Sequence, residues 1–502
     1  MKKLPGYTIV IPRARSLSGL MVHEGIFEEA SDQAVVSHRG MAHLIARAEG
    51  PAGRVAVVIG SPVFGGYVNR VAAAQALAAA ENPSVFIFGL KGEYLALLFN
   101  PASGALTVFA DRYGSYPAYY AQNNDAVCIS YHYLDLARHI KHWPGFSLRP
   151  EKAYEFLTLQ RLMGGETHDT LSHILPPAGM LTLAPGGEVA VTRYRQVDYT
   201  RREGGTLSDR VEEFTARFLN AMKTLSAPRT GIYLSGGHDS RFVAMTAAPG
   251  ADCDTLGFSD NYEVGCARRI AAACGHVHHY AALSGDYFEQ TLDEAAYLSG
   301  GMYATDHALF LGKIADDAPS VYLHGHGLDF MFQGMYLHAV PVRFMGRETY
   351  VRRMTPFPPD MTRHFIDTVS FRMKFDAAPF YTDHAASFAD ALYGTVREVY
   401  EAGARLTDDL SARWEYLIFH HPARHYTYTN VLSKRTRGEV RTPSLDHDVY
   451  DFYLSLPERF RIHADVLRGA MRRVSPAAAM IPAGNHALPA ALGPYAKTAW
   501  RA

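Results

Sequence analysis

The sequence predicts an α/β protein built from two domains. Its first two hundred residues alternate short apolar runs with Gly, Pro, Asn and Asp, which is typical of strands and turns. After residue 203, short apolar strands alternate with helical segments, which predicts a parallel sheet. A chain of 502 residues is also longer than one ordinary domain. We therefore expect one domain over residues 1–203 and a second over 204–502.

Two hairpins are predicted in the first domain. The segment "YLALLFNPASGALTVFA" has a turn at residues 100–104, with one strand ending at Phe99 and the next beginning at Ala105. A second hairpin turns at the Pro-Gly-Gly of residues 185–187. A polar, Gly-containing linker follows. The apolar residues of "LSDRVEEFTARFLNAM" then recur at helical spacing, which predicts a helix with Ser208 as its N-cap.

The second domain repeats a strand–loop–helix pattern. The strands are predicted in "TGIYL", "DTLGFS", "HVHHYAAL" and "SVYLHGHG", and the helices in "SRFVAMTAA" and "EVGCARRIAAACG", the latter ending at Gly275. Strands that alternate with helices in this way form a parallel sheet with ligands at the carboxyl ends of the strands. Beyond residue 335 the pattern is helical and irregular, and we predict no topology there.

Composition excludes several classes of function. The hydrophobic fraction is 48%, the charged fraction 20% and the formal net charge −1, so no global field attracts nucleic acid or an anionic membrane. No run of eighteen uncharged apolar residues occurs, and the start of the chain is a poor signal peptide. We expect a cytoplasmic protein, as a homodimer or with pathway partners. The cysteines fit no zinc spacing and are expected to be reduced: Cys128, Cys253, Cys266 and Cys274.

The segment "YLSGGHDSR" places small residues directly after a predicted strand. Small residues let backbone N–H groups approach an anion closely, and the next helix adds its positive end. Ser235 and Ser240 can add hydroxyl donors, but Asp239 would repel a phosphate unless Mg²⁺ lay between them. The loop lacks the Gly-Lys-Ser/Thr of a Walker motif. It predicts a site for the pyrophosphate end of ATP, the alternative being a tight turn that needs glycine for backbone reasons.

The whole chain resembles the asparagine synthetase family, which includes β-lactam synthetase and lasso-peptide cyclases. "YLSGGHDSR" resembles the family's SGGxDS pyrophosphate loop, "LHGHGLDFMFQG" its GxGxDExxGG segment, and "SKRTRGEVRTPSLDHDVYDFYLSLP" its late segment. "GEYLALLFNPASGALTVFADRYGSYPAYY" and "TLSHILPPAGMLTL" resemble the family's glutaminase-like domain. The resemblance implies a degenerate Ntn-type αββα domain, followed by a doubly wound parallel-sheet domain of the adenine nucleotide α-hydrolase type.

The resemblance also implies ATP and Mg²⁺ as cofactors. Asp239 and Asp329 fall at the family's metal-carboxylate positions and, with Ser235, would be its catalytic residues here. For Asp329 the alternative is a helix N-cap. Glu263 is the acidic residue that opens the helix after the adenine-pocket strand. The residues expected to hold the nucleotide are Leu234, Ser235, Gly236, Gly237, Asp239, Ser240, Phe258 and Gly325, of which Leu234 and Phe258 could equally be core residues.

Two departures from the family change the expected chemistry. The family's glutaminase nucleophile is an N-terminal Cys, whereas Lys2 stands at that position here and no cysteine precedes Cys128. We therefore expect no glutaminase activity, with the amine coming from ammonia or from the substrate itself. His326 and Phe330 stand where the family has acidic residues, on either side of its second metal carboxylate. A late family lysine is replaced by Ala464, and the candidates to substitute for it are Lys434, Arg435 and Arg468.

Other polar residues have plainer interpretations. Glu439, Arg441 and Asp446 match charged positions of the late segment, and we expect a structural ion-pair network under the site. The histidines of "HVHHY" (residues 276–280) are expected to lie at a half-exposed strand end rather than to bind metal. Asp306 is the best candidate to contact a cationic group of a substrate, although a cap is as common.

These observations favour an ATP-dependent ligase that activates a carboxylate of a small molecule or peptide as an acyl-adenylate. Two alternatives stay open: an intramolecular cyclase of a natural product, and a degenerate nucleotide-binding scaffold. A tRNA-thiolating enzyme is disfavoured, because the chain lacks a basic surface and paired catalytic cysteines.

Overall fold

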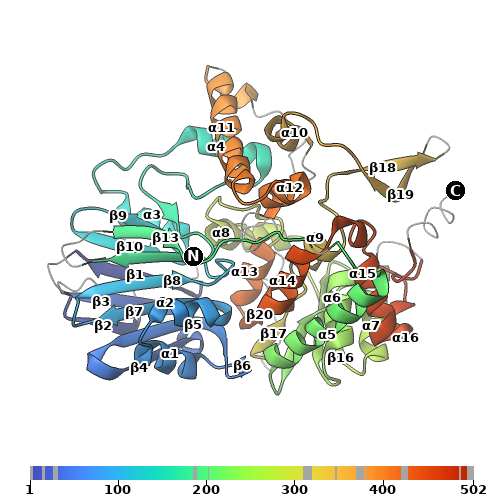
Figure 1. Ribbon diagram of the computed structural model, residues 1–502, viewed down its shortest axis with the longest axis horizontal. Helices are drawn as coiled ribbons and strands as arrows, with labels where there is room; N and C mark the ends of the chain where they lie inside the picture. Colours follow the sequence, from blue (N-terminus) through green and yellow to red (C-terminus); the bar gives the residue numbers. More distant parts are fainter. Residues whose placement is uncertain are drawn as a thin grey trace.

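Two β-sheets face each other in the N-terminal part of the protein (Figure 1). The computed structural model describes residues 4–13, 17–25, 32–184, 189–201, 203–308, 319–344, 347–368, 378–381, 383–419, 428–484 and 488–493. The first sheet, in spatial order, contains β11 (His173–Ile174), β9 (Tyr119–Gln122), β10 (Ala126–Ser130), β1 (Gly6–Pro12), β3 (Gln33–Arg39) and β2 (Gly19–Glu24). The second contains β13 (Val189–Arg193), β12 (Gly179–Leu183), β8 (Ala105–Ala110), β7 (Lys91–Asn100), β5 (Val55–Phe64) and β4 (Ile45–Glu49), with β6 (Tyr67–Val68) beside β5.

Successive side chains of each strand point alternately to the two faces of its sheet, and the two faces contact different layers. In β5, Val57 and Ile59 point into the core between the sheets, whereas Ala56 and Val58 pack under helices on the outer face. Helices α1 (Arg70–Ala79) and α2 (Pro83–Gly89) cover that face, and α3 (Tyr133–Ile140) packs on β9 and β10 of the first sheet. The expected αββα layering is therefore confirmed. The hairpin of β7 and β8 also forms as predicted, whereas the predicted turn at residues 185–187 lies outside the described residues.

The chain then enters helix α5 (Leu207–Leu225). Its N-cap is Thr206, whose hydroxyl accepts a hydrogen bond from the Asp209 N–H at 3.3 Å, while the Asp209 carboxylate accepts the Thr206 N–H at 2.8 Å. The prediction of Ser208 as N-cap was wrong, because Thr206 forms the reciprocal pair with Asp209 three residues on.

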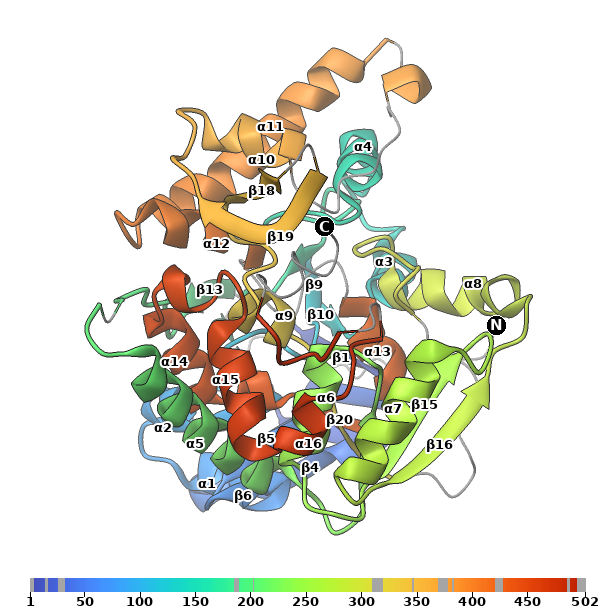
Figure 2. The same ribbon diagram turned by 90° about the vertical axis from the view of Figure 1, so that its right-hand side faces the viewer.

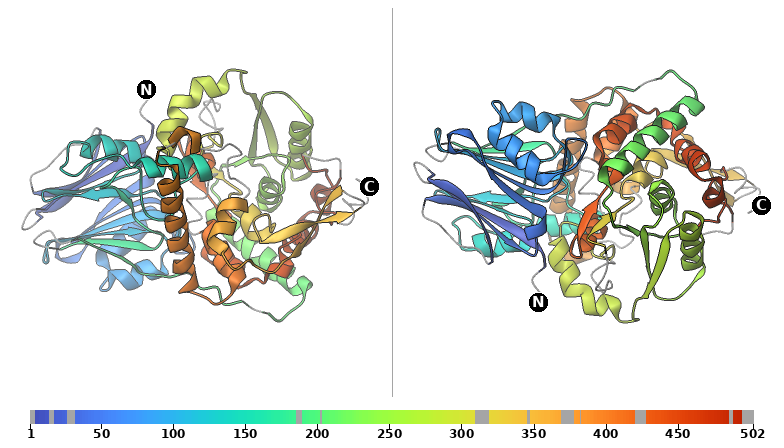
Figure 3. Two further views of the ribbon diagram at one scale, coloured as in Figure 1. Left: turned by 90° about the horizontal axis from the view of Figure 1, so that it is seen from above. Right: turned by 90° about the horizontal axis from the view of Figure 1, so that it is seen from below.

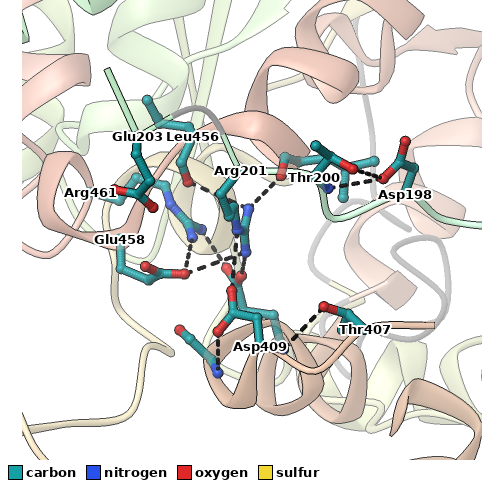
Figure 4. Close-up of polar contacts among 12 residues, drawn as sticks. Asp198, Thr200, Arg201, Glu203, Thr407, Asp409, Leu456, Glu458 and Arg461 are labelled. Carbon is teal, nitrogen blue, oxygen red and sulfur yellow. Dashed lines mark hydrogen bonds and ion pairs between the residues drawn. The ribbon is translucent and has the colours of Figure 1, made fainter. Parts of the chain in front are cut away.

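Arg201, just before α5, joins the connecting segment to the C-terminal half (Figure 4). Its guanidinium donates to the carbonyl oxygen of Leu454 at 2.6 Å and forms an ion pair with Glu415. Arg461 forms an ion pair with the same carboxylate, and Glu415 and Arg461 are fully buried. This cluster attaches the connecting segment to the helices beyond the parallel sheet.

A five-stranded parallel sheet forms the centre of the C-terminal half (Figure 2). Its order is β16 (Val277–Ala282), β15 (Asp252–Gly257), β14 (Thr230–Tyr233), β17 (Val321–Leu323) and β20 (Glu439–Arg441). The chain moves outward from β14 to β15 and β16, then returns to the other side of β14 at β17. This reversal is the topological switch point at which doubly wound sheets bind ligands. The four predicted strands are confirmed; β20 was not predicted, because three buried residues show no alternation.

Both faces of this sheet are covered. Ile232 and Leu323 pack with α5, α6 (His238–Thr246) and α7 (Tyr262–Ala273), while Tyr233 and Tyr322 point to the opposite face, under α8 (Tyr287–Ser299) and α13 (Thr429–Arg435). Helices on both faces confirm the doubly wound class.

The two halves lie side by side and share apolar cores (Figure 3). The core between the N-terminal sheets extends to residues of α8 and α13, and α4 (Pro150–Leu159) packs on α11 (Ala385–Ala404). The remaining elements are α9 (Leu328–Phe332), β18 (Ala339–Phe344), β19 (Arg347–Met354), α10 (Met361–Thr368), α12 (Leu410–Phe419), α14 (His447–Ser455), α15 (Asp465–Val474), α16 (Pro476–Ala479) and 3-10 helices at Ala42–Leu44, Pro51–Gly53, Ala378–Tyr381, Pro443–Leu445 and Glu458–Phe460. Within the described ranges no helix is both long and apolar enough to cross a bilayer.

Candidate active site

The loop between β14 and α6, residues 234–237, has an ordered pattern of hydrogen bonds. The Ser240 hydroxyl accepts the Ser235 N–H at 2.9 Å and lies 2.9 Å from the Ser235 hydroxyl, which in turn accepts the Gly237 N–H at 3.2 Å. Gly237 is the N-cap of α6 and supplies no side-chain cap. The first turn of a helix has N–H groups without intrahelical partners, so this end of α6 is suited to an anion.

A buried arginine supports the loop from behind. Arg241 is fully buried, and its guanidinium donates to the carbonyl oxygens of Gly236 at 3.0 Å and of Pro482 at 2.7 Å. The Gly484 N–H also donates to the Gly236 carbonyl at 3.0 Å. A Cβ on Gly236 would lie 2.6 Å from the Gly484 Cα, so this close approach requires glycine. Gly236 thus packs against the segment after α16, behind the pocket.

A pocket of about 550 Å³ opens in front of the loop, at the carboxyl ends of β14, β15 and β17. It brings together the sequence-predicted residues Leu234, Ser235, Gly237, Asp239, Ser240, Phe258, Glu263, Gly325 and Asp329. Gly236 is the one predicted nucleotide-binding residue that is not among the described residues lining this pocket. The pocket is also lined by residues that the sequence did not predict: Tyr233, Asp254, His307, His324 and Asn430. It is lined as well by Lys434, one of the candidates to replace the late family lysine.

Two carboxylates meet in this pocket. Asp239 and Asp329 are partly accessible as residues, yet burial raises the pKa of Asp329 to about 6. Burial, followed by the neighbouring Asp329 carboxylate, raises the pKa of Asp239 well above its ordinary range. The Gln333 amide donates to Asp239 Oδ1 at 2.5 Å. Asp329 lies in the first turn of α9, whose N-cap is Gly327, so the alternative reading of Asp329 as a helix N-cap was wrong.

The acidic pair fits Mg²⁺ in the presence of a nucleotide. Mg²⁺ is usually held by one or two carboxylates together with phosphate oxygens. Among the described residues, no group of three or more His, Cys, Asp or Glu side chains could hold a metal ion by itself. The pair therefore suits a cation whose coordination is completed by a bound phosphate.

Gly325 follows β17 and lies close to Asp239, in the first turn of α6. A Cβ at Gly325 would lie 2.8 Å from the carbonyl carbon of Asp239 and 3.0 Å from its Cβ. We expect Gly325→Ala to displace Asp239, to weaken Mg·ATP binding by roughly tenfold and to destabilise the protein by about 1–3 kcal/mol. Titration calorimetry and thermal unfolding measure the two effects.

The matched control for this substitution is Gly265→Ala. Gly265 lies within α7, and a Cβ there has open space around it. We expect this variant to be stabilised by about 0.5–1 kcal/mol, with unchanged Mg·ATP affinity. Equal nucleotide binding by both variants would show that the contact with Asp239 is unimportant.

The two ends of the pocket differ in chemistry. Near β15 and β16 it has apolar side chains: Phe258 is 51% exposed there, and Leu256 and Leu283 also line the pocket. Leu234 is 3% exposed and belongs to the main apolar core as well as to the pocket wall. Near β17, at the opposite end, lie His324 and Lys434.

The expected ion-pair network is only partly correct. Glu439 accepts hydrogen bonds from Arg441 at 2.6 Å, from Ser61 at 2.7 Å and from Arg70 at 2.5 Å, so it joins β20 to the N-terminal sheets. Asp446 does not belong to this network. It caps α14 by accepting the Asp448 N–H at 2.9 Å, because a carboxylate before a helix satisfies the free N–H groups of the first turn.

The candidates to replace the family's late lysine lie in different environments. Ala464 is 3% exposed, has φ +58° and packs in the apolar core. Arg435 forms an ion pair with Glu93 of β7 at 2.7 Å, so it faces the N-terminal sheets. Of Lys434, Arg435 and Arg468, only Lys434 is among the described residues that line the pocket. Lys434 lies in α13, most of whose residues are buried although only Val431 and Leu432 are apolar.

The remaining predictions concern residues outside the pocket. His276, His278 and His279 bond to the Ala244 carbonyl, the Thr255 hydroxyl and the Asp252 carboxylate, which agrees with a structural role. The Asp306 side chain is 67% exposed and does not line the pocket; its neighbour His307 does. Lys2 lies outside the described residues.

The pocket lies within a region that matches a known family. Residues 214–482, 269 of the 502 residues, match the model of the asparagine synthase family. No curated protein matches the chain in sequence. Similar solved structures include a glutamine phosphoribosylpyrophosphate amidotransferase from B. subtilis complexed with ADP and GMP, at 12% identity and TM-score 0.24, covering 57% of this chain and 64% of that one. Another is an allosteric regulatory enzyme of purine biosynthesis, at 11% identity and TM-score 0.23, covering 64% and 68%. The chain thus spans less than two thirds of the B. subtilis protein.

Proposed function

The chain belongs to the asparagine synthase family, and from this premise we propose that it is an ATP-dependent ligase that joins a carboxylate to an amine through an acyl-adenylate. Family membership supports a ligase that forms carbon–nitrogen bonds. The observation that carries the proposal is the pocket in which the loop before α6 meets Asp239 and Asp329.

Each part of the pocket has a role in this proposal. The apolar end at Phe258 would hold the adenine, and the Ser235 and Ser240 hydroxyls with the N-terminus of α6 would hold the β- and γ-phosphates. Asp239 and Asp329 would hold Mg²⁺, which when bound neutralises phosphate charge and makes the α-phosphorus a better electrophile. These groups are in place before the reaction, so they stabilise developing charge without reorganising.

The proposed reaction has two steps. An oxygen of the substrate carboxylate forms a bond to the α-phosphorus, the bond from that phosphorus to the bridging oxygen of pyrophosphate breaks, and pyrophosphate leaves. The amine nitrogen then attacks the acyl carbon, AMP leaves and the nitrogen loses a proton. We propose a small molecule or peptide as the carboxylate substrate, with ammonia or the same molecule supplying the amine. The paired carboxylates favour catalysis over a degenerate scaffold.

The test is pyrophosphate release from Mg·ATP with a panel of carboxylic acids, with Asp239→Ala as the negative control. We expect release that depends on one class of carboxylate and is absent in the variant. If Mg·ATP does not bind to the wild-type protein, the proposal is wrong. If it binds and no acid in a panel of amino acids, uronic acids and peptides causes release, the scaffold alternative replaces it.

A further inference from the structure

Lys434 is placed at the end of the pocket opposite Phe258. Among the described residues that line the pocket it is the only lysine or arginine, whereas Asp239, Asp254, Glu263 and Asp329 are acidic. With the base over β15 and the phosphates on the loop after β14, the β17 side of the pocket lies beyond the phosphates as seen from the base. Lys434 lies on that side.

The amine of Lys434 is held by three neighbours. Its side chain is 3% exposed, and Nζ lies 2.6 Å from Nε2 of His324 and in contact with the Asn430 Oδ1. Nζ also lies 4.7 Å from the centroid of the Tyr233 ring. These residues come from α13, from the loop after β17 and from β14, so the position of the amine depends on three elements of the fold.

The hydrogen bonds of His324 determine the protonation of this pair. The His326 N–H donates to His324 Nδ1 at 3.3 Å, so Nδ1 carries no proton. A neutral imidazole then carries its proton on Nε2, which must donate to Lys434 Nζ. Only a neutral amine has a lone pair to accept it, so the geometry indicates an uncharged Lys434 in the empty pocket.

The surroundings agree with this assignment. Burial lowers the pKa of Lys434 well below its ordinary value. Burial, followed by Lys434 and His326, also lowers the pKa of His324. The Tyr233 ring also faces the amine, and burial raises the pKa of its hydroxyl. A triphosphate and a carboxylate entering this pocket add several negative charges, which favour the protonated amine.

We infer that Lys434 binds the phosphates of the nucleotide: it is a neutral amine bonded to His324 in the empty pocket and becomes an ammonium ion in contact with these phosphates when the nucleotide enters. A proton from solvent forms the new N–H bond at Nζ, and the hydrogen bond from His324 Nε2 to Nζ breaks. This inference rests on the proposed function, because it requires a nucleotide in the pocket.

Proton uptake on binding tests the inference. The probe is Mg·α,β-methylene-ATP, whose α–β bridge cannot be cleaved, so it cannot transfer its adenylyl group. It is titrated by calorimetry at about pH 8 in two buffers of different ionisation enthalpy. The difference between the two apparent enthalpies measures the protons taken up. We expect about one proton per nucleotide bound by the wild-type protein.

Lys434→Met removes the ionisable group and keeps most of the apolar stem. We expect it to bind the probe at least about tenfold more weakly and without proton uptake. Lys91→Met is the matched control, since the Lys91 amine bonds Asp448 at 2.9 Å outside this pocket. It should bind the probe with wild-type affinity and uptake.

The outcomes separate the two proposals. Binding without uptake in the wild type, or uptake that persists in Lys434→Met, would overturn the role of Lys434 and leave the proposed function intact. Absence of binding in the wild type would overturn both. Uptake that is lost only in Lys434→Met supports the inference, and Lys434→Arg should then restore affinity but not uptake, because arginine is always charged.

Discussion

Replacing Asp239 by asparagine is expected to abolish the response to Mg·ATP while making the empty protein more stable. Asp239 and Asp329 are neighbouring carboxylates, and burial raises the pKa of each. The neutral amide removes the cost of burying a charge at residue 239 and its repulsion with Asp329 in the empty pocket. We expect Tm to rise by roughly 2–4 °C, the shift that 1 kcal/mol produces in a domain of ordinary size. Mg·ATP affinity should fall by at least roughly 100-fold, because in the proposed function Asp239 is a ligand of Mg²⁺.

Asp252→Asn is the matched control for Asp239→Asn. Asp252 begins β15, at the end of the strand far from the pocket, and pairs with Arg229 at 3.0 Å. Its variant should keep wild-type nucleotide affinity and gain no stability. Thermal unfolding with and without Mg·ATP measures all of these effects. Wild-type affinity in Asp239→Asn would exclude Asp239 as a metal ligand.

The Glu415→Gln substitution is expected to have the largest effect on stability. Glu415 and Arg461 are fully buried, and Arg201 bonds the same carboxylate with a side chain that is 7% exposed. The neutral amide would leave two buried guanidinium groups without their counter-charge. Loss of one partner of such a pair costs about 3–5 kcal/mol. Urea denaturation, followed by the fluorescence of the adjacent Trp414, measures the loss.

The pH dependence provides a second check on Glu415. Burial alone would raise the pKa of this carboxyl, but the Arg461 and Arg201 charges outweigh it and hold the pKa below the ordinary 4.5. The unfolded chain therefore binds the proton more readily, so the stabilisation is complete above pH 4.5 and is lost as pH falls through the folded pKa. Glu415→Gln should lack this acid-sensitive contribution.

Glu49→Gln is the control for Glu415→Gln. The Arg47–Glu49 pair is also an ion pair, with an N–O distance of 2.8 Å, but its side chains are 39% and 66% exposed. Water screens such a pair, and its loss should leave the denaturation midpoint unchanged. Equal effects of Glu415→Gln and Glu49→Gln would show that the buried carboxylate is not important for stability.

Much of the parallel sheet could be predicted because its signals are local. Four strands were recognised from short apolar runs, and the Ser235 loop from small residues between a strand and a helix. β20 could not be recognised, because two of its three residues, Glu439 and Arg441, are charged. Their burial depends on partners far away in the sequence, such as Ser61 and the Leu225 carbonyl. Likewise, the sequence predicted that Asp446 belongs to an ion-pair network. In the structure its carboxylate instead caps the first turn of α14.

The sequence by itself determined the class of fold and the loop before α6 with Asp239, because the residue types that specify them are adjacent in the chain. Asp329 was identified through the resemblance of its segment to the family. The tertiary structure alone decided between Lys434 and Arg435. Successive residues on a helix point about 100° apart, so Lys434 reaches the pocket while Arg435 reaches Glu93. Whether a side chain of α13 points into the pocket depends on elements that are hundreds of residues away in the sequence. A local sequence pattern does not contain that information.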